Sequence, residues 1–143
     1  NFQFVYHTKE RFFGYENTWI NQNEKVMVSD LEKTLVDALT RPHLSGGLVE
    51  IGKALYESKD KIDYQKLLEY LSRNENEATK KRFLFLVDLL GLTWKPHYNE
   101  MLKRIGPSFP VLDTTGPNQG RKNSRFGLKI NIDVSTIKNS IFT

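Results

Sequence analysis

Few residues in this chain have the types and spacing that catalysis needs. The three histidines lie far apart and form no ligand-spaced pair, and His97 has a carboxylate, that of Glu100, three residues away on an expected helix. Such a pair could hold one corner of a metal site, but short motifs discriminate poorly, and a solvent-facing pair is the simpler interpretation. The chain has no cysteine, which excludes thiol nucleophiles, cysteine-ligated metals and disulfides. The other two histidines are His7 and His43.

The segment Glu57-Ser58-Lys59 resembles half of a metal-dependent nuclease site. No companion aspartate stands on a preceding strand, and a lysine at a helix end also complements the helix dipole. The sequence contains no phosphate-binding loop, dinucleotide-binding glycine motif or serine nucleophile elbow. We therefore expect a non-enzymatic protein with no catalytic residues, no bound metal and no cofactor, and keep the nuclease as a minor alternative.

Two groups of charged residues remain as candidates for binding. Lys33, Asp37 and Arg41 recur every four residues, so they would follow one another along one face of a helix. This row is either a solvated set of ion pairs or a polar strip that faces a partner. Together with Arg82, these residues form the predicted polar strip.

The second group is basic and lies in the polar stretch 114–125. Residues 95–143 hold 8 Lys/Arg against 3 Asp/Glu, whereas residues 1–94 hold 13 against 14. A basic third beside a neutral remainder points to a polyanion or an acidic partner. We predict a polyanion-binding loop, with an ordinary exposed hairpin loop as the alternative. Its basic residues are Arg121, Lys122 and Arg125.

The elements that must position these residues can be read from periodicity. Aromatic and β-branched residues favour strands over 2–6, 12–20 and 25–28, with a turn at 21–23. A capping box of Ser29 and Glu32 predicts a helix that Pro42 ends near residue 41. Gly46-Gly47 opens a second helix, and Asp63 caps a third.

A fourth helix is predicted from about residue 74 to Gly91, with a second half so apolar that it belongs in the centre of the core. A fifth helix follows Pro96. In the tail, 109–112 favours a short strand, and the strict alternation over 126–135 favours a long one. We expect a single α+β domain over residues 1–143. Its antiparallel sheet would combine the N- and C-terminal strands, covered by about five central helices.

Size and composition agree with one globular domain. The chain has 143 residues, with 38% hydrophobic and 27% charged residues, which argues against disorder and coiled coil. No apolar run is long enough for a membrane helix, so we expect a cytoplasmic protein. The chain begins at Asn1 rather than methionine, and we interpret it as a fragment of a longer protein.

One stretch resembles a known family. The run from Val28 to Pro42, with the following Ser45 to Glu50, is similar to the signature of AbiEi proteins. The family pattern is Val-Ser-x-x-Glu-Arg-Thr-Leu-Leu-Asp, then Arg-Pro, then Gly-Gly and an acidic helix. Lys33 replaces the usual arginine, and Val36 a leucine. The residues that fit it and also shape the helices are Ser29, Glu32, Pro42, Gly46 and Gly47.

Weaker matches extend the resemblance to residue 131. Residues 81–91 are similar to an Arg-Leu-Gly-x-Leu segment of the family, with Phe85 where glycine is common. Leu112-Asp113 and the stretch 125–131 resemble its closing strand, with Phe126 where tryptophan is frequent.

The resemblance implies an antitoxin and transcriptional autoregulator of a toxin–antitoxin, or abortive infection, system. The family joins an N-terminal winged-helix DNA-binding domain to a C-terminal antitoxin domain, and this chain would be the latter. The partner would be a nucleotidyltransferase-like toxin, counteracted without a stable complex, and DNA would be bound by the upstream domain. From another class, a nucleic-acid-binding module using the basic C-terminal third remains the alternative.

Overall fold

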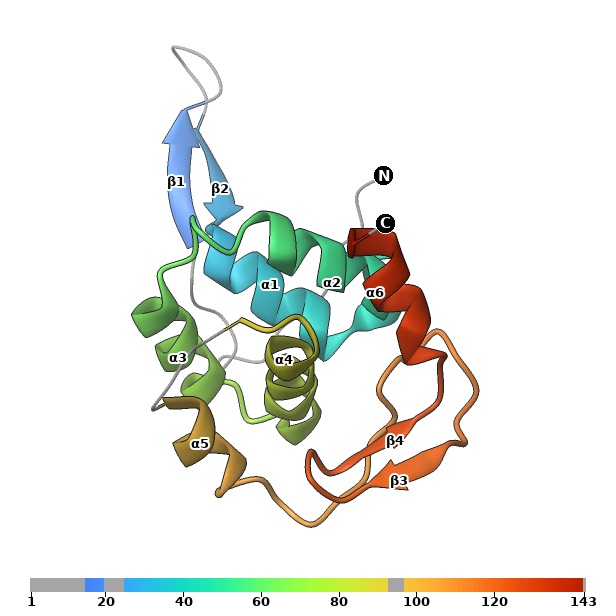
Figure 1. Cartoon of the computed structure of the whole chain (residues 1–143). Helices are drawn as coiled ribbons and strands as arrows, with labels where there is room; N and C mark the ends of the chain where they lie inside the picture. Colours follow the sequence, from blue (N-terminus) through green and yellow to red (C-terminus); the bar gives the residue numbers. More distant parts are fainter. Residues whose placement is uncertain (1–14, 20–24, 93–96, 143) are drawn as a thin grey trace.

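The fold is built around one central helix. The computed structural model describes residues 15–19, 25–92 and 97–142. In Figure 1, α4 (Glu77–Leu89) lies in the middle, and α1 (Leu31–Thr40) packs on α2 (Leu48–Glu57), α3 (Tyr64–Arg73) and α4. The short helix α5 (His97–Leu102) contacts α4, and α6 (Val134–Phe142) packs on α2. No helix in the described part of the chain has the length and apolar character to cross a membrane.

The strands form two separate antiparallel pairs. β1 (Tyr15–Trp19) pairs with β2 (Lys25–Ser29), and β3 (Arg121–Asn123) pairs with β4 (Leu128–Ile130). The α+β class is confirmed, but the shared sheet of N- and C-terminal strands is wrong for the described residues, since each pair forms its own two-stranded sheet. The strand predicted at 2–6 and the turn at 21–23 lie outside those residues.

The core confirms the predicted role of α4. Five consecutive residues, 83–87, are buried, the most exposed of them at 7%, so the helix is covered on all sides, as its all-round apolar pattern predicts. It begins at Glu77, where the side chain of Asn76 accepts a hydrogen bond from the N–H of Ala78 (2.9 Å). It ends before Gly91, whose φ of +69° is the left-handed conformation that glycine adopts most readily.

The start of α1 differs from the predicted capping box. The N-cap is Asp30, whose Oδ1 accepts the N–H of Lys33 (2.8 Å). Ser29 instead contacts the hydroxyl of Thr34 (2.8 Å). Glu32 does not reach back, because its Oε2 accepts the N–H of Asp63 (3.1 Å) across to α3. An aspartate one residue later thus displaces the serine as cap, since a carboxylate is at least as good an acceptor.

The C-terminal part is the main error of the sequence prediction. The alternation at 126–135 gives only the three-residue β4, and Val134 already lies in α6. Asp133 explains the change, because its Oδ1 accepts the N–H (3.0 Å) and hydroxyl (2.7 Å) of Ser135 at the start of the helix. Residues 109–112 form a single parallel bridge, Val111 to Lys129, rather than a strand. The stretch 114–125 contains β3.

Candidate functional site

The predicted polar strip does not lie on the surface as a row. The side chain of Lys33 is 0% exposed and pairs with Asp37 at 3.0 Å, while Asp37 retains 29% exposure. The N–H of Arg41 donates to the carbonyl of Asp37 (3.1 Å) and ends the helix. The interpretation as solvated ion pairs is therefore wrong for Lys33. Because α2, α3 and α4 all pack against α1, little of its surface is left for an exposed polar row.

Arg82, the fourth member of the strip, is a buried link between segments far apart in the sequence. It is 3% exposed. Its guanidinium donates to the carbonyl oxygens of Leu39 (2.8 Å) and Thr40 (3.4 Å) at the end of α1, and twice to that of Val111 (2.9 and 3.2 Å). Burial lowers the pKa of Arg82 to about 10, against the opposing effect of the Asp113 carboxylate. Arg82 therefore remains charged at neutral pH.

Asp113 caps a helix from a distant segment. It is 4% exposed, and its Oδ2 accepts the N–H of Leu48, the first residue of α2, at 3.0 Å. Its Oδ1 accepts the N–H (2.9 Å) and hydroxyl (2.7 Å) of Thr115. Gly47 precedes the helix without a side chain to cap it. A carboxylate at a helix N-terminus is favoured by unpaired N–H groups and by the helix dipole.

Gly47 must be glycine for two reasons. Its φ is +92°, and a Cβ built there would lie 3.2 Å from both Oδ2 of Asp113 and Oγ1 of Thr115. The predicted role of Gly46-Gly47 as a tight inter-helix turn is thus confirmed. The turn also leaves room for the capping carboxylate.

Asn131 completes the same network from the other side. Its side chain accepts the N–H of Asp113 (3.0 Å) and donates to the carbonyls of Asp113 (2.7 Å) and Pro117 (2.8 Å). We call the region where residues 41–48 meet residues 111–117 the corner. Its interior is held by Arg82, Asp113 and Asn131, which together fix the path of two loops.

The corner also has an exposed side. The main-chain N–H of His43 donates to Oγ1 of Thr114 (3.1 Å), and its ring Nδ1 lies 3.0 Å from the same oxygen. Both residues are exposed, as are Ser45 and Gly46. We call these four residues the corner surface. It consists of short polar groups on a firmly anchored backbone, which suits recognition by a partner better than acid–base chemistry.

A second polar cluster joins α1 to α3. Oδ2 of Asp30 accepts the hydroxyl of Tyr70 (2.7 Å) and contacts the ammonium of Lys66 (2.9 Å). Burial by itself would raise the pKa of Asp30, but hydrogen bonds from Tyr70, Lys66 and the main chain of Lys33 outweigh it and hold that pKa below its usual value. Burial, followed by the bond to Asp30, raises the pKa of Tyr70 to about 12.

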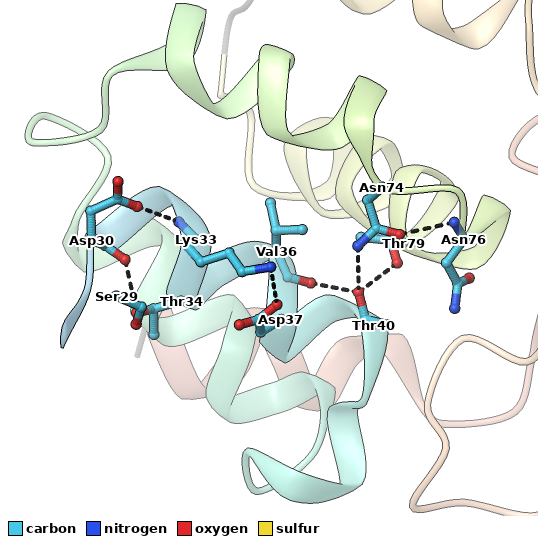
Figure 2. Close-up of polar contacts among 10 residues, drawn as sticks. All are labelled: Ser29, Asp30, Lys33, Thr34, Val36, Asp37, Thr40, Asn74, Asn76 and Thr79. Carbon is cyan, nitrogen blue, oxygen red and sulfur yellow. Dashed lines mark hydrogen bonds and ion pairs between the residues drawn. The ribbon is translucent and has the colours of Figure 1, made fainter. Parts of the chain in front are cut away.

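The far end of α1 is fixed in a similar way. The hydroxyl of Thr40 donates to the carbonyl of Val36 (2.8 Å) and lies within hydrogen-bond distance of Asn74 (3.2 Å) and Thr79 (2.8 Å). Asn74 in turn accepts the N–H of Asn76 (2.9 Å), as Figure 2 shows. Both ends of α1 are thus held by polar contacts from α3 and α4. The helix that carries the strip is a fixed part of the scaffold.

The three residues of the predicted polyanion-binding loop have different environments. Arg121 and Lys122 are exposed on β3. Arg125 contacts the carboxylate of Asp88 (3.5 Å) and the hydroxyl of Tyr98 (3.2 Å). The structure therefore leaves two of the three basic side chains open to a ligand, while the third joins this loop to α4 and α5.

The residues considered for metal chemistry are not brought together. Lys59 pairs with Asp60 (3.7 Å) and lies over the ring of Tyr56, rather than near a carboxylate pair. Glu100 pairs with Arg104 (3.6 Å). Among the residues that the structure describes, no group of three or more His, Asp or Glu side chains could hold a metal ion. His7 lies outside these residues.

The sequence indicates the stretches in which the site residues lie, but it does not show which distant groups they bind. Asp113 and Asn131 lie in stretches that carry the resemblance, yet nothing local shows that one caps α2 and the other binds its main chain. A signal did exist for Asp113, because Asp-x-Thr favours an Asx turn. For Asp30, the signal was its place immediately before the apolar periodicity.

Three comparisons with known proteins found no match to this chain. A scan against models of known protein families finds no match. Searches of curated proteins and of solved structures likewise find no significant match. The function proposed for this chain therefore rests on its residues and on their geometry.

Proposed function

We propose that this chain is the antitoxin domain of an AbiEi-like toxin–antitoxin system, acting without catalysis against a nucleotidyltransferase-like toxin. The observation that carries this proposal is that the separate segments of the resemblance meet at the corner. Arg82 binds the carbonyl of Leu39, Asp113 binds the N–H of Leu48, and Asn131 binds Asp113. Residues up to 65 positions apart in the sequence thus support one another directly.

The geometry divides the motif residues by role. Arg82 is buried and binds main-chain carbonyls, and Lys33 is buried and pairs with Asp37. The corner surface of His43, Ser45, Gly46 and Thr114 is accessible. A surface whose backbone is already fixed loses little entropy when it is recognised. We therefore expect antitoxicity to depend on the corner surface. Transcriptional autoregulation would require DNA binding by a winged-helix domain preceding these residues.

Co-expression tests the proposal. The chain, alone or fused to any upstream residues that its gene encodes, is expressed with the nucleotidyltransferase-like protein encoded beside its gene, and growth is measured. Growth is the readout because the resemblance implies no stable complex. We expect the chain to restore growth. If no such gene is adjacent, or if neither form restores growth, the proposal is wrong.

A variant pair locates the effect. His43→Ala combined with Thr114→Ala removes both partners of one exposed contact, and we expect it to reduce rescue while the protein remains folded by circular dichroism. Ser72→Ala, on the exposed side of α3, is the control, because its hydroxyl bonds only within that helix. Equal rescue by the two variants would show that the corner surface is not involved.

A further inference from the structure

The β3–β4 hairpin is extended by a third stretch of chain. The N–H of Lys129 donates to the carbonyl of Pro110, and the N–H of Leu112 donates to the carbonyl of Lys129, both at 2.9 Å. β4 therefore lies between β3 and residues 110–112. Figure 1 shows β3 on the outer side of this small sheet.

The register places two lysines directly opposite each other. Lys122 of β3 is paired with Lys129 of β4, and Lys129 is bridged to Val111. Side chains of paired residues project from the same face of a sheet. The neighbouring positions Leu112 and Leu128 are completely buried, so the face that carries the lysines points away from the core.

The segment that forms the β3–β4 hairpin carries positive charge and no negative charge. Between Asp113 and Asp133, the chain has four basic residues and no acidic one. Both flanking carboxylates are engaged, with Thr115 and Ser135 respectively. Within the described residues, neither lysine forms an ion pair. Like charges directly opposite on paired strands are unfavourable, and a bound anion would remove this repulsion.

An aromatic ring lies on the same face. Phe109 is two residues before Val111, and the ammonium of Lys122 lies 5.2 Å from the centre of its ring. Proteins that bind single-stranded nucleic acid combine a basic surface with aromatic rings on which bases stack. An acidic peptide would use the lysines but not the ring. The combination therefore favours nucleic acid over an acidic protein.

We propose that the outer face formed by Phe109, Lys122 and Lys129, here called the lysine face, binds single-stranded nucleic acid. A phosphate lies between the two ammonium groups, and a base stacks on Phe109 after the ammonium of Lys122 moves off the ring. Arg121, exposed at the start of β3, adds charge at the border. Arg125 takes no part, because Asp88 and Tyr98 hold it. This site does not depend on antitoxin activity.

Fluorescence anisotropy with a labelled oligothymidine of about 20 nucleotides, longer than the usual footprint of one small domain, tests the site. We expect binding that weakens with salt, with a slope of about +1.4 in log Kd against log salt for two phosphates at about 0.7 each. Lys122→Gln with Lys129→Gln should weaken binding about tenfold or more. Phe109→Leu, which keeps an apolar side chain but removes the ring, should weaken it about fivefold.

The matched control is Lys61→Gln with Lys103→Gln, which removes the same charge at two exposed positions in other parts of the fold. We expect this control to bind within about twofold of the original chain. The site is disproved if the control loses as much affinity as the lysine-face variant, or if the chain does not bind at low ionic strength. Equal binding of a polyglutamate peptide, unaffected by Phe109→Leu, would assign the face to an acidic protein instead.

Discussion

The corner and the lysine face both carry charged side chains, but in opposite surroundings. In the corner, Arg82 and Asp113 are at most 4% exposed, and their hydrogen bonds go mainly to main-chain groups of other segments. On the lysine face, Lys122 is exposed, and neither it nor Lys129 has an ionic partner within the described residues.

This difference shows how position decides what a charge does. Burying a charged group is costly unless hydrogen bonds satisfy it, so a buried arginine that binds three carbonyls can be kept only where the backbone is held in one arrangement. Exposed lysines impose no such requirement on the fold. The corner therefore specifies the structure, and the lysine face remains available to a ligand.

The strongest test of the comparison is to remove the buried arginine of the corner and, separately, an exposed arginine outside it. Arg82→Met fills similar space but leaves the buried carbonyls of Leu39 and Val111 without a donor, and we expect it to lower the free energy of unfolding by about 3–5 kcal/mol. Arg125→Met removes a half-exposed arginine and should cost less than about 1 kcal/mol. Urea unfolding of the two variants measures both values. Equal losses would mean that the corner is not the organising region.

The two corner glycines provide a second test. Gly47→Ala must adopt a φ of +92° and bring its Cβ within 3.2 Å of Asp113 and Thr115, so we expect a loss of about 2–3 kcal/mol. Gly46→Ala has a similar φ of +82°, but meets only the side chain of Glu50, which can move. It should cost about 1–2 kcal/mol. If thermal unfolding ranks them in the reverse order, the space around the capping carboxylate is not what requires glycine.

The turn at Gly46-Gly47 could be predicted because it depends on neighbouring residues in the sequence. The helix over 31–40, the proline–glycine turn, the Asp63 cap and the Gly91 stop likewise follow from neighbouring residues. The sequence could not show that Lys33 is buried, because the elements covering α1 come from three other segments. Nor could periodicity predict that Asp133 begins a helix, since Ile130, Ile132 and Val134 alternate across that boundary. Long-range partners of Arg82 and Asp113 depend on tertiary contacts alone.

The polar cluster of Asp30, Lys66 and Tyr70, which joins α1 to α3, is intermediate in burial between the corner and the lysine face. It predicts that stability depends on pH. The pKa of Tyr70 is raised to about 12, so the folded protein retains a proton that the unfolded chain loses near pH 10. Its contribution to stability is therefore complete below about pH 10 and is lost as pH rises through about 12.

Tyr70→Phe isolates this contribution. We expect it to cost about 1.5 kcal/mol at neutral pH, because the carboxylate of Asp30 loses a donor, and to make the decline in stability above about pH 10 shallower. Urea midpoints measured across the alkaline range give both values. Tyr64→Phe is the control for the loss at neutral pH alone, since the hydroxyl of Tyr64 donates to the main-chain carbonyl of Lys59 while burial and Asp60 raise its own pKa as well. An identical alkaline decline in the original chain and Tyr70→Phe would contradict the role of this bond.

The smallest expected effect is a gain in stability, where the earlier substitutions cause losses. On the lysine face, Lys129→Gln removes one of two like charges that face each other across the strands, and we expect it to stabilise the protein by about 0.2–0.5 kcal/mol at low salt. Because salt screens exposed charges, the gain should disappear as ionic strength rises, whereas the loss in Arg82→Met should persist. A gain unchanged by salt would mean that Lys129 destabilises the fold through packing, and the lysine pair would then no longer indicate a binding face.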